Sequence, residues 1–449
     1  LWGGTYKHER INDKLSEWNM LDSSGFSIPT VTDSVGFQDP SAQEYQLLEL
    51  FEVIKAKNQI SSNRVQGYLQ GNFNLHRSKD ITFSGPYEVG DSTYKKDTSF
   101  TSNAYFKINA GVRTHYWDYN GQNVISPRLV LEYKPRLYFW EDEKLYRRSS
   151  SIRLSVGQYA QPAFYREYRD FNGDLNPEIR AQKSVHFVLG ADYIFNMWNR
   201  KFKYTVEGYY KHLTDIVPYE IDNVKLRYFA ENNAVGYAYG LDMKINGEFI
   251  KGIESWVTFG YLKTEEDIQG DYYYNYYNSD GEEILVGFTA NSTVADSQLV
   301  EPGYIPRPTD QRVSVGLYFQ DHMPKDLIRG GKFKWETLSV NLNIVFGTAL
   351  PYGPPNHERW RDVLRTPPYR RVDIGFAKDI LSQDQKDRKK DGSFIKKIAK
   401  MKLSVEVFNL LDINNVVSYN WIKDVSGRSY AVPSYLTSRR LNVRLTTTF

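Results

Sequence analysis

The sequence predicts an all-β fold, a transmembrane antiparallel β-barrel, on three observations. Apolar and polar residues alternate in segment after segment along the whole chain of 449 residues. These segments are about 10 to 13 residues long, whereas ordinary globular strands average roughly 5 to 6, so they are long enough to cross a hydrocarbon layer when tilted. Tyrosine is also abundant, because the 35 Tyr outnumber the 24 Phe and 9 Trp together. Aromatic rings with a polar tip suit a water–lipid interface.

The composition excludes several other classes. Hydrophobic residues make up 41% of the chain and the mean hydropathy is −0.57, so no stretch approaches the roughly 18 to 20 apolar residues of a membrane helix. A barrel strand needs only about 10 residues, half of which face a polar interior. The net charge of +3 does not indicate nucleic acid as a partner. Without cysteine the chain has no disulfide framework and no thiolate metal site.

The alternation predicts fourteen strands in this chain. They are expected at 1–11, 64–75, 103–118, 123–134, 150–159, 184–196, 200–212, 237–249, 253–264, 311–320, 336–347, 369–380, 402–410 and 440–449. One face of each strand is apolar and the other carries charge. We expect the charged face to line the barrel lumen, with members such as Lys107, Arg113, Arg153, Lys203, Glu207, Asp242, Lys244, Glu248 and Arg444. A barrel of this size is too wide to be filled by side chains, so its lumen holds water or a polar plug.

The connections between these strands differ in length in a way that supports a barrel. Alternate connections include the large outer loops 12–63, 265–310, 348–368 and 411–439, whereas the others include the short turns "MWN" and "KGI". Outer-membrane barrels have short periplasmic turns and long outer loops. Loops longer than about 15 residues are uncommon in soluble domains.

Two of the outer loops hold candidate ligand-binding residues. Loop 265–310 has ten acidic residues against one basic, with "DYYYNYYNSDGEE" at its centre. The rings of Tyr272, Tyr273, Tyr274, Tyr276 and Tyr277 could stack on sugars or aromatic ligands, or hydrogen-bond a peptide. Loop 348–368 offers Tyr352, His357, Arg359 and Trp360. The alternative for both loops is packing over the barrel mouth, or contact with a partner lipoprotein.

Signatures of enzymes and metal sites are incomplete. "HERIN" (8–12) and "HERWR" (357–361) begin like a zinc-protease motif, but Asn12 and Arg361 stand where the second histidine is required. No P-loop, G-x-S-x-G or G-x-G-x-x-G occurs. The acidic "NSDGEE" (278–283) fails the EF-hand spacing, because Tyr276 occupies the first ligand position. We therefore expect no catalytic residue, no metal and no cofactor, and the protein is predicted not to be an enzyme.

Several segments, in this order, resemble the barrel portion of TonB-dependent outer-membrane receptors, and most of all those of Bacteroidota. They are "VISPRLVLEYKP" (124–135), "VGQYAQPAFYREY" (156–168), "NPEIRAQKSVHFVLGADYIF" (176–195), "AYGLDMKINGEF" (238–249), "YRRVDIGF" (369–376) and "VEVFNLLDINN" (405–415). The resemblance implies a 22-stranded barrel in the outer membrane of a Gram-negative cell, with an N-terminal plug and a segment that engages the TonB energy-coupling complex. It implies energised uptake of a scarce, bulky solute such as a siderophore, haem, cobalamin, a glycan or a peptide.

Under this resemblance, residues 1–449 are the C-terminal portion of one barrel domain. The plug, the TonB-contacting segment and the first eight strands are then expected outside this chain. The final segment "SRRLNVRLTTTF" resembles the signal read by the barrel-assembly machinery, with Leu441, Val443, Leu445 and Phe449 facing lipid. Thr447 stands where that signal usually has an aromatic residue.

Two other classes of function stay open from the sequence. A receptor-like barrel could serve as a structural or assembly component of an outer-membrane complex, or as a passive pore. A soluble all-β glycan-binding protein is the third interpretation.

Overall fold

The computed structural model describes most of the chain. The described residues are 1–22, 48–83, 87–89, 92–94, 98–135, 138–141, 144–147, 149–198, 200–250, 253–285, 288–322, 338–355, 358–359, 363–381, 398–423 and 429–448. No described helix is long and apolar enough to cross a membrane.

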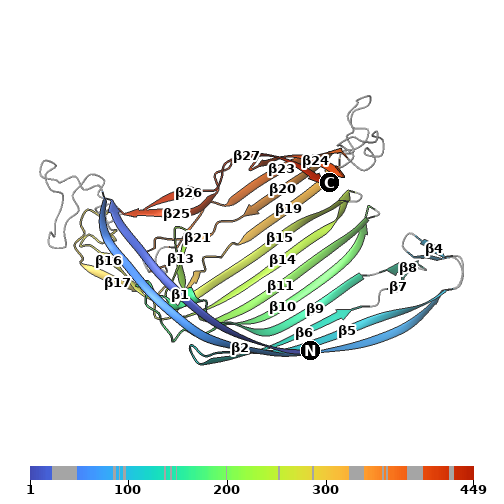
Figure 1. The fold of residues 1–449 in the computed structure, drawn as a ribbon, viewed down its shortest axis with the longest axis horizontal. Helices are drawn as coiled ribbons and strands as arrows, with labels where there is room; N and C mark the ends of the chain where they lie inside the picture. Colours follow the sequence, from blue (N-terminus) through green and yellow to red (C-terminus); the bar gives the residue numbers. More distant parts are fainter. Residues whose placement is uncertain are drawn as a thin grey trace.

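One large antiparallel sheet organises the molecule, and Figure 1 shows that it is strongly bent. In order across the sheet, its strands are β1 (Trp2–Asp22), β2 (Leu48–Phe83), β5 (Thr98–Trp117), β6 (Gln122–Lys134), β9 (Ser149–Gln161), β10 (Gln182–Met197), β11 (Arg200–Ile216), β14 (Ala234–Ile250), β15 (Ile253–Ile268), β19 (Val313–His322), β20 (Leu338–Gly347), β23 (Tyr369–Leu381), β24 (Lys400–Phe408) and β27 (Arg440–Thr448). The short strand β18 (Tyr304–Pro306) pairs with β15 beside this path. The all-β prediction is confirmed, and each expected strand is present in the expected order.

The first outer loop is shorter than the sequence predicts. Residues 12–22 and 48–63, assigned to loop 12–63, belong to β1 and β2, whose register runs from Trp2↔Leu69 to Asp22↔Leu48. The prediction was wrong here because both stretches are largely polar, so their alternation is weak. Their strand conformation depends on the backbone hydrogen bonds that each provides to the other. Residues 23–47 of that loop lie outside the described residues.

Cross-strand register gives the sheet one apolar face and one charged face. Directly opposed residues form an apolar row across nine neighbouring strands: Leu75, Phe106, Tyr133, Ile152, Ala191, Val206, Met243, Phe259 and Val315. The row on the opposite face is polar and contains Lys107, Glu132, Arg153, Gly190, Glu207 and Asp242. Many large apolar side chains are exposed, for example Leu189 at 59% and Leu441 at 68%. The apolar face is thus left uncovered by the described chain.

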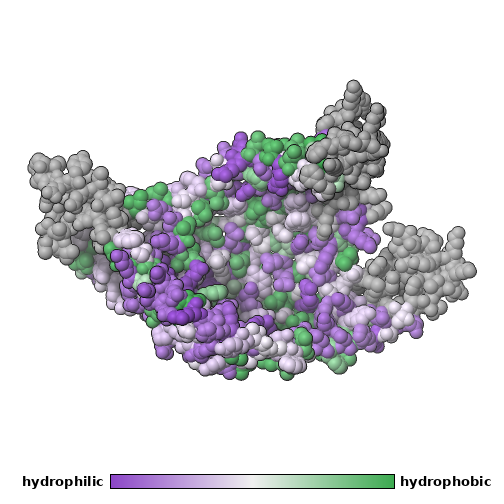
Figure 2. Space-filling model, in the orientation of Figure 1, coloured by the Kyte–Doolittle hydropathy of each residue, from purple (hydrophilic) through white to green (hydrophobic). Residues whose placement is uncertain are grey.

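The two ends of the sheet carry different connections (Figure 1). At one end, tight turns join β10 to β11 and β14 to β15, next to a small sheet made of β3 (Tyr87–Val89), β4 (Ser92–Tyr94), β7 (Tyr138–Glu141) and β8 (Lys144–Arg147). The other end, called the loop end below, carries four hairpins. They are β12 (Tyr219–Asp222) with β13 (Lys225–Tyr228), β16 (Tyr273–Tyr277) with β17 (Asp296–Val300), β21 (Pro351–Tyr352) with β22 (Leu364–Arg365), and β25 (Val416–Lys423) with β26 (Ser429–Tyr435). Hydrophilic side chains gather over this end in Figure 2.

A small core holds the loop between β9 and β10 in place. Its 3-10 turn η2 (Tyr165–Tyr168) brings Tyr168, which is fully buried, edge-on to Trp117 at 5.4 Å between ring centroids. Arg169 then donates to both carboxylate oxygens of Asp13 in β1, at 2.9 and 2.8 Å. Aromatic packing and an ion pair, in which one guanidinium nitrogen of Arg169 donates to both oxygens of Asp13, therefore fix this loop against strands that lie far away in sequence.

Candidate functional site

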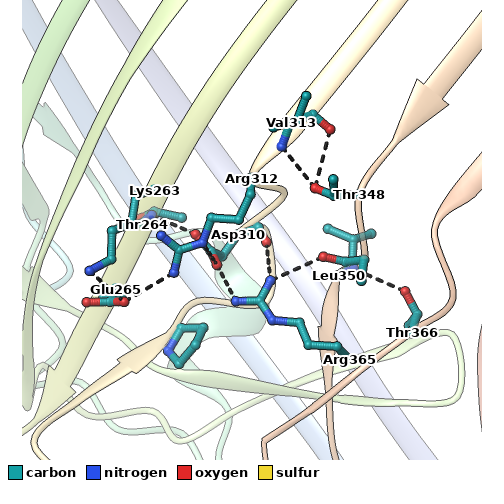
Figure 3. Close-up of polar contacts among 12 residues, drawn as sticks. Lys263, Thr264, Glu265, Asp310, Arg312, Val313, Thr348, Leu350, Arg365 and Thr366 are labelled. Atoms are coloured by element: carbon teal, nitrogen blue, oxygen red, sulfur yellow. Dashed lines mark hydrogen bonds and ion pairs between the residues drawn. The ribbon is translucent and has the colours of Figure 1, made fainter.

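Two of the buried carboxylates at the loop end each pair with two arginines, and the first is Asp310 (Figure 3). Asp310 has no exposed surface. Its Oδ2 pairs with Arg312 Nε at 2.9 Å and Arg365 Nη2 at 2.5 Å, while its Oδ1 accepts a hydrogen bond from the Thr264 backbone N–H at 2.8 Å. These partners come from β15, β22 and the segment before β19, so hydrogen bonds and ion pairs to Asp310 hold these three segments to one another.

The second buried carboxylate is Glu266 in β15, which is 1% exposed. Its Oε2 pairs with Arg307 Nε at 2.8 Å, and its Oε1 pairs with Arg359. Arg359 Nη1 also donates to the Pro306 carbonyl at 3.2 Å. Burial lowers the pKa of Arg359 to about 10, so its guanidinium stays charged at neutral pH. Arg359, a predicted ligand contact, is thus part of the ion-pair network that holds its loop.

A small recess lies beside Arg359 and is lined by prolines and Tyr352. The ring of Tyr352 stacks on Tyr419 of β25, with 4.2 Å between centroids and 13° between planes. Trp421 lies 6.0 Å from the same ring. Hence Tyr352 and Arg359, the two predicted ligand contacts of loop 348–368 that the structure describes, lie at one site. Tyr352 stacks on Tyr419 and Arg359 pairs with Glu266. His357 and Trp360 lie outside the described residues.

The five predicted tyrosines of loop 265–310 are divided between the two faces of the β16–β17 hairpin. Tyr272, Tyr274 and Tyr276 are 57%, 40% and 43% exposed. Their successive ring centroids are 6.0 and 6.2 Å apart. Tyr273 and Tyr277 alternate with them and are half-buried. The three exposed rings, called the tyrosine ladder below, form a row that a ligand can reach.

The side chain of Asn278 folds the acidic turn of this loop. Asn278 Oδ1 accepts from the backbone N–H groups of Asp280 and Glu282, at 3.0 and 2.9 Å, which folds "NSDGEE" into a tight turn. Asp271 precedes the hairpin, and burial together with the charges of Asp267 and Glu301 raises its pKa to about 6. Within the described ranges, no three His, Cys, Asp or Glu side chains are grouped so that they could hold a metal ion.

The β25–β26 hairpin reaches across the loop end. Ser418 Oγ donates to Asn223 Oδ1 in the β12–β13 hairpin at 2.7 Å, and β25 also contacts β1. In Figure 1 the tip of this hairpin lies beside the far end of β1. A segment that lies between the last two strands of the sheet therefore meets the first strand.

Sequence reasoning missed the two buried carboxylates and three of their arginine partners, Arg307, Arg312 and Arg365. One signal was available, because loop 265–310 is strongly acidic while loop 348–368 holds three arginines, Arg359, Arg361 and Arg365. Opposite charge on two loops at the same end of a sheet favours pairing between them. Which residues pair is decided by the tertiary structure alone.

Comparisons with known proteins gave matches in structure only. No family model matches the sequence, and no curated protein does. The chain is similar to outer-membrane receptors. The outer membrane transporter YddB from Escherichia coli has a TM-score of 0.46 and 12% identity, with 100% of this chain and 60% of that one covered. The siderophore receptor PiuA from Acinetobacter baumannii has a TM-score of 0.47 and 11% identity, with 99% and 52% covered.

A third similar structure is the ferric enterobactin receptor PfeA from Pseudomonas aeruginosa, in complex with enterobactin. Its TM-score is 0.47 and its identity 11%, with 99% of this chain and 60% of that one covered. The chain thus spans about half to three fifths of the length of these receptors.

Proposed function

We propose that this chain is part of the barrel of a TonB-dependent receptor in the outer membrane, which takes up a scarce, bulky solute. The observation that supports it most is the single bent sheet of long strands with an uncovered apolar face and a charged opposite face. An apolar face this large is unstable in water but suits lipid, and the charged face suits a wet lumen or a polar plug. The similar structures, all outer-membrane receptors, agree with this proposal.

The loop end would then face the outside and meet the solute first. In this proposal the tyrosine ladder contacts the ligand, because its rings are exposed and regularly spaced. The other predicted residues support the mouth: Tyr352 and Arg359 hold loop 348–368 against β25 and β15. A surface lipoprotein is a proposed partner at this end, and the TonB complex a proposed partner on the periplasmic side.

The last strand fits the proposed route of assembly. Leu441, Val443 and Leu445 are 68%, 60% and 58% exposed on one face of β27, as expected for side chains that face lipid. We propose that this strand carries the signal for the barrel-assembly machinery. Phe449, the final member of the predicted signal, lies outside the described residues.

Membrane association and uptake can be tested separately on the full gene product in a Gram-negative host. We expect extraction only with detergent, heat-modifiable migration on gels, and solute uptake that is lost when TonB is deleted. Extraction into aqueous buffer would contradict the barrel and favour the soluble alternative. Uptake that persists without TonB would contradict energised import and favour a passive pore.

A further inference from the structure

The charged face of the sheet carries a cluster of basic side chains close to the loop end. This cluster, called the basic wall, consists of Arg64 in β2, Arg113 and His115 in β5, and Arg128 in β6. The register places His115 opposite Gln66, and Arg128 between Gly111 and Gly157 on the two neighbouring strands. Two adjoining recesses share Arg113 and Arg128, and the larger has a volume of about 490 Å³. Neither recess has a carboxylate among its lining residues.

Aromatic rings orient two of these guanidinium groups. Arg128 lies 4.1 Å above the ring of Tyr159, and that ring stacks in turn on His186 at 4.2 Å. Arg64 lies 3.9 Å from the ring of Trp117. Stacking against an aromatic face holds the plane of a guanidinium while its edge stays able to donate hydrogen bonds.

Gly157 keeps the space beside Arg128 open. A Cβ added at Gly157 would come within 3.1 Å of Arg128 Cγ and 3.3 Å of the Tyr159 ring. A larger residue there would press on the arginine and the ring together. The arrangement therefore depends on a small residue opposite Arg128.

The basic wall lacks the neutralising partners found elsewhere on the same face. Among the described residues, Arg113 donates only to the neutral Gln66 amide, at 2.5 Å, and Arg128 has no hydrogen bond or ion pair. By contrast, Arg153 and Lys203 both pair with Asp192, each at 3.4 Å. The side chain of His115 adds a buried Nε2 with no hydrogen-bond partner in the described chain. Within the described residues, Arg64 is the only member of the basic wall that pairs with a carboxylate, and its Nε lies 3.0 Å from Glu9 Oε2.

We propose that the basic wall binds a small anionic ligand with at least two carboxylate- or phosphate-like groups. The guanidinium fork matches such oxyanions with two parallel hydrogen bonds, and Arg113 and Arg128, which have no carboxylate partner among the described residues, can each hold one of them. The larger of the two recesses has the size of a small-molecule site. Both recesses lie just inside the loop end, where a solute entering between the loops would arrive. This inference rests on the proposed receptor function and specifies the charge of its solute.

Calorimetric titration of the detergent-solubilised full gene product with citrate, a small tricarboxylate, tests the proposal. We expect binding that weakens with added salt, and no binding of xylitol, an uncharged polyol. The double substitution Arg113→Gln with Arg128→Gln should weaken citrate binding about tenfold or more, because it removes both forks. The matched control is Arg153→Gln with Lys203→Gln, which removes two cations of the same face that already have a carboxylate partner.

Two outcomes would overturn the proposal: citrate fails to bind, or the two double variants lose affinity equally. Heat-modifiable migration of each variant shows whether its barrel is folded. If the Gln variant does not fold, the double substitution Arg113→Lys with Arg128→Lys replaces it, because lysine keeps the charge but lacks the guanidinium fork. Unchanged affinity of that variant for citrate would also reject the site. Titration does not depend on TonB, so a negative result with a heat-modifiable, detergent-extracted barrel counts against the anion site and leaves the receptor function standing.

Discussion

Asp310 shows how much of the loop end depends on single buried residues. Its carboxylate serves two guanidinium groups and one backbone N–H with no exposure to solvent. Burying a charge is costly unless it is paired, so removing one partner costs more than the pair contributes net. The loops at this end therefore depend on Asp310 more than on any exposed ion pair of the described chain.

We predict that Asp310→Asn loosens the loops around β18 and β22 without unfolding the sheet. The change leaves Arg312 and Arg365 without their shared carboxylate, a loss of about 3 kcal/mol by the usual cost of breaking a buried pair. Hydrogen exchange of 301–312 and 363–366 should become faster. Asp296→Asn, at an exposed position of β17, is the control. Equal exchange in both variants would show that the network does not hold the loops.

Asp271 predicts a pH dependence of the tyrosine hairpin. Its pKa is raised from an ordinary 3.8 to about 6 by burial and by the nearby Asp267 and Glu301. The folded state binds this proton more tightly than the unfolded state does. The resulting stabilisation of the hairpin is fully present below the ordinary pKa of Asp271 and is lost as the pH rises through about 6. Protection of the β16–β17 amides, corrected for intrinsic exchange, should therefore be greater at pH 5 than at pH 7.5.

The substitution Asp271→Asn should remove this pH dependence and leave the hairpin as protected at pH 7.5 as at pH 5. Asp280→Asn, in an exposed turn of the same loop, should keep it. A wild-type hairpin that is equally protected at both pH values would refute the assignment to Asp271.

At the scale of the element, β27 alternates between two environments. Val443 is 60% exposed on the apolar face, whereas the neighbouring Asn442 donates to Glu406 at 3.0 Å on the charged face. Adjacent residues of a strand point to opposite faces. A single charge therefore tests which face meets lipid.

We predict that Val443→Arg lowers the yield of assembled protein in the outer membrane, whereas Asn442→Arg is tolerated. A lipid-facing arginine costs roughly 2–4 kcal/mol near the bilayer midplane and less near the interfaces, but a lumen-facing one meets water and Glu406. Heat-modifiable protein in membrane fractions measures the yield. Equal loss in both variants would argue against a lipid-facing Val443.

Across the whole molecule, the β25–β26 hairpin joins parts of the sheet that are distant in sequence. Its contacts reach the β12–β13 hairpin and β1, so the loops of the last strands lie against those of earlier ones. Through the stacking of Tyr352 on Tyr419, the β21–β22 hairpin joins the same group, so three of the four hairpins at the loop end are connected.

We predict that Asn223→Cys combined with Ser418→Cys forms a disulfide, because Ser418 Oγ lies 2.7 Å from Asn223 Oδ1. The sequence of this chain contains no other cysteine. Oxidised protein should migrate differently on gels from reduced protein, and each single variant should show no such shift. The absence of a shift in the double variant would mean that the two hairpins are not in contact in the membrane.

The sequence by itself determined the fold class, the fourteen strands and the two faces of the sheet. Each of these depends on alternation between neighbouring residues, which is a local property: a strand between lipid and a polar lumen must change character at every position. Where alternation is weak, as at 12–22, the prediction was wrong, because strand pairing does not require an apolar face.

Only the tertiary structure decided which residues meet at the loop end. Glu266 pairs with Arg359 across 93 residues and Asp310 with Arg365 across 55, and no local pattern relates them. The same holds for the basic wall, whose three arginines lie on three different strands and whose lack of nearby carboxylates becomes evident only once the register is known. Long-range pairs depend on how the chain is brought together in space. The residues of the site could therefore be identified only from the structure, whereas the strands could be predicted from the sequence.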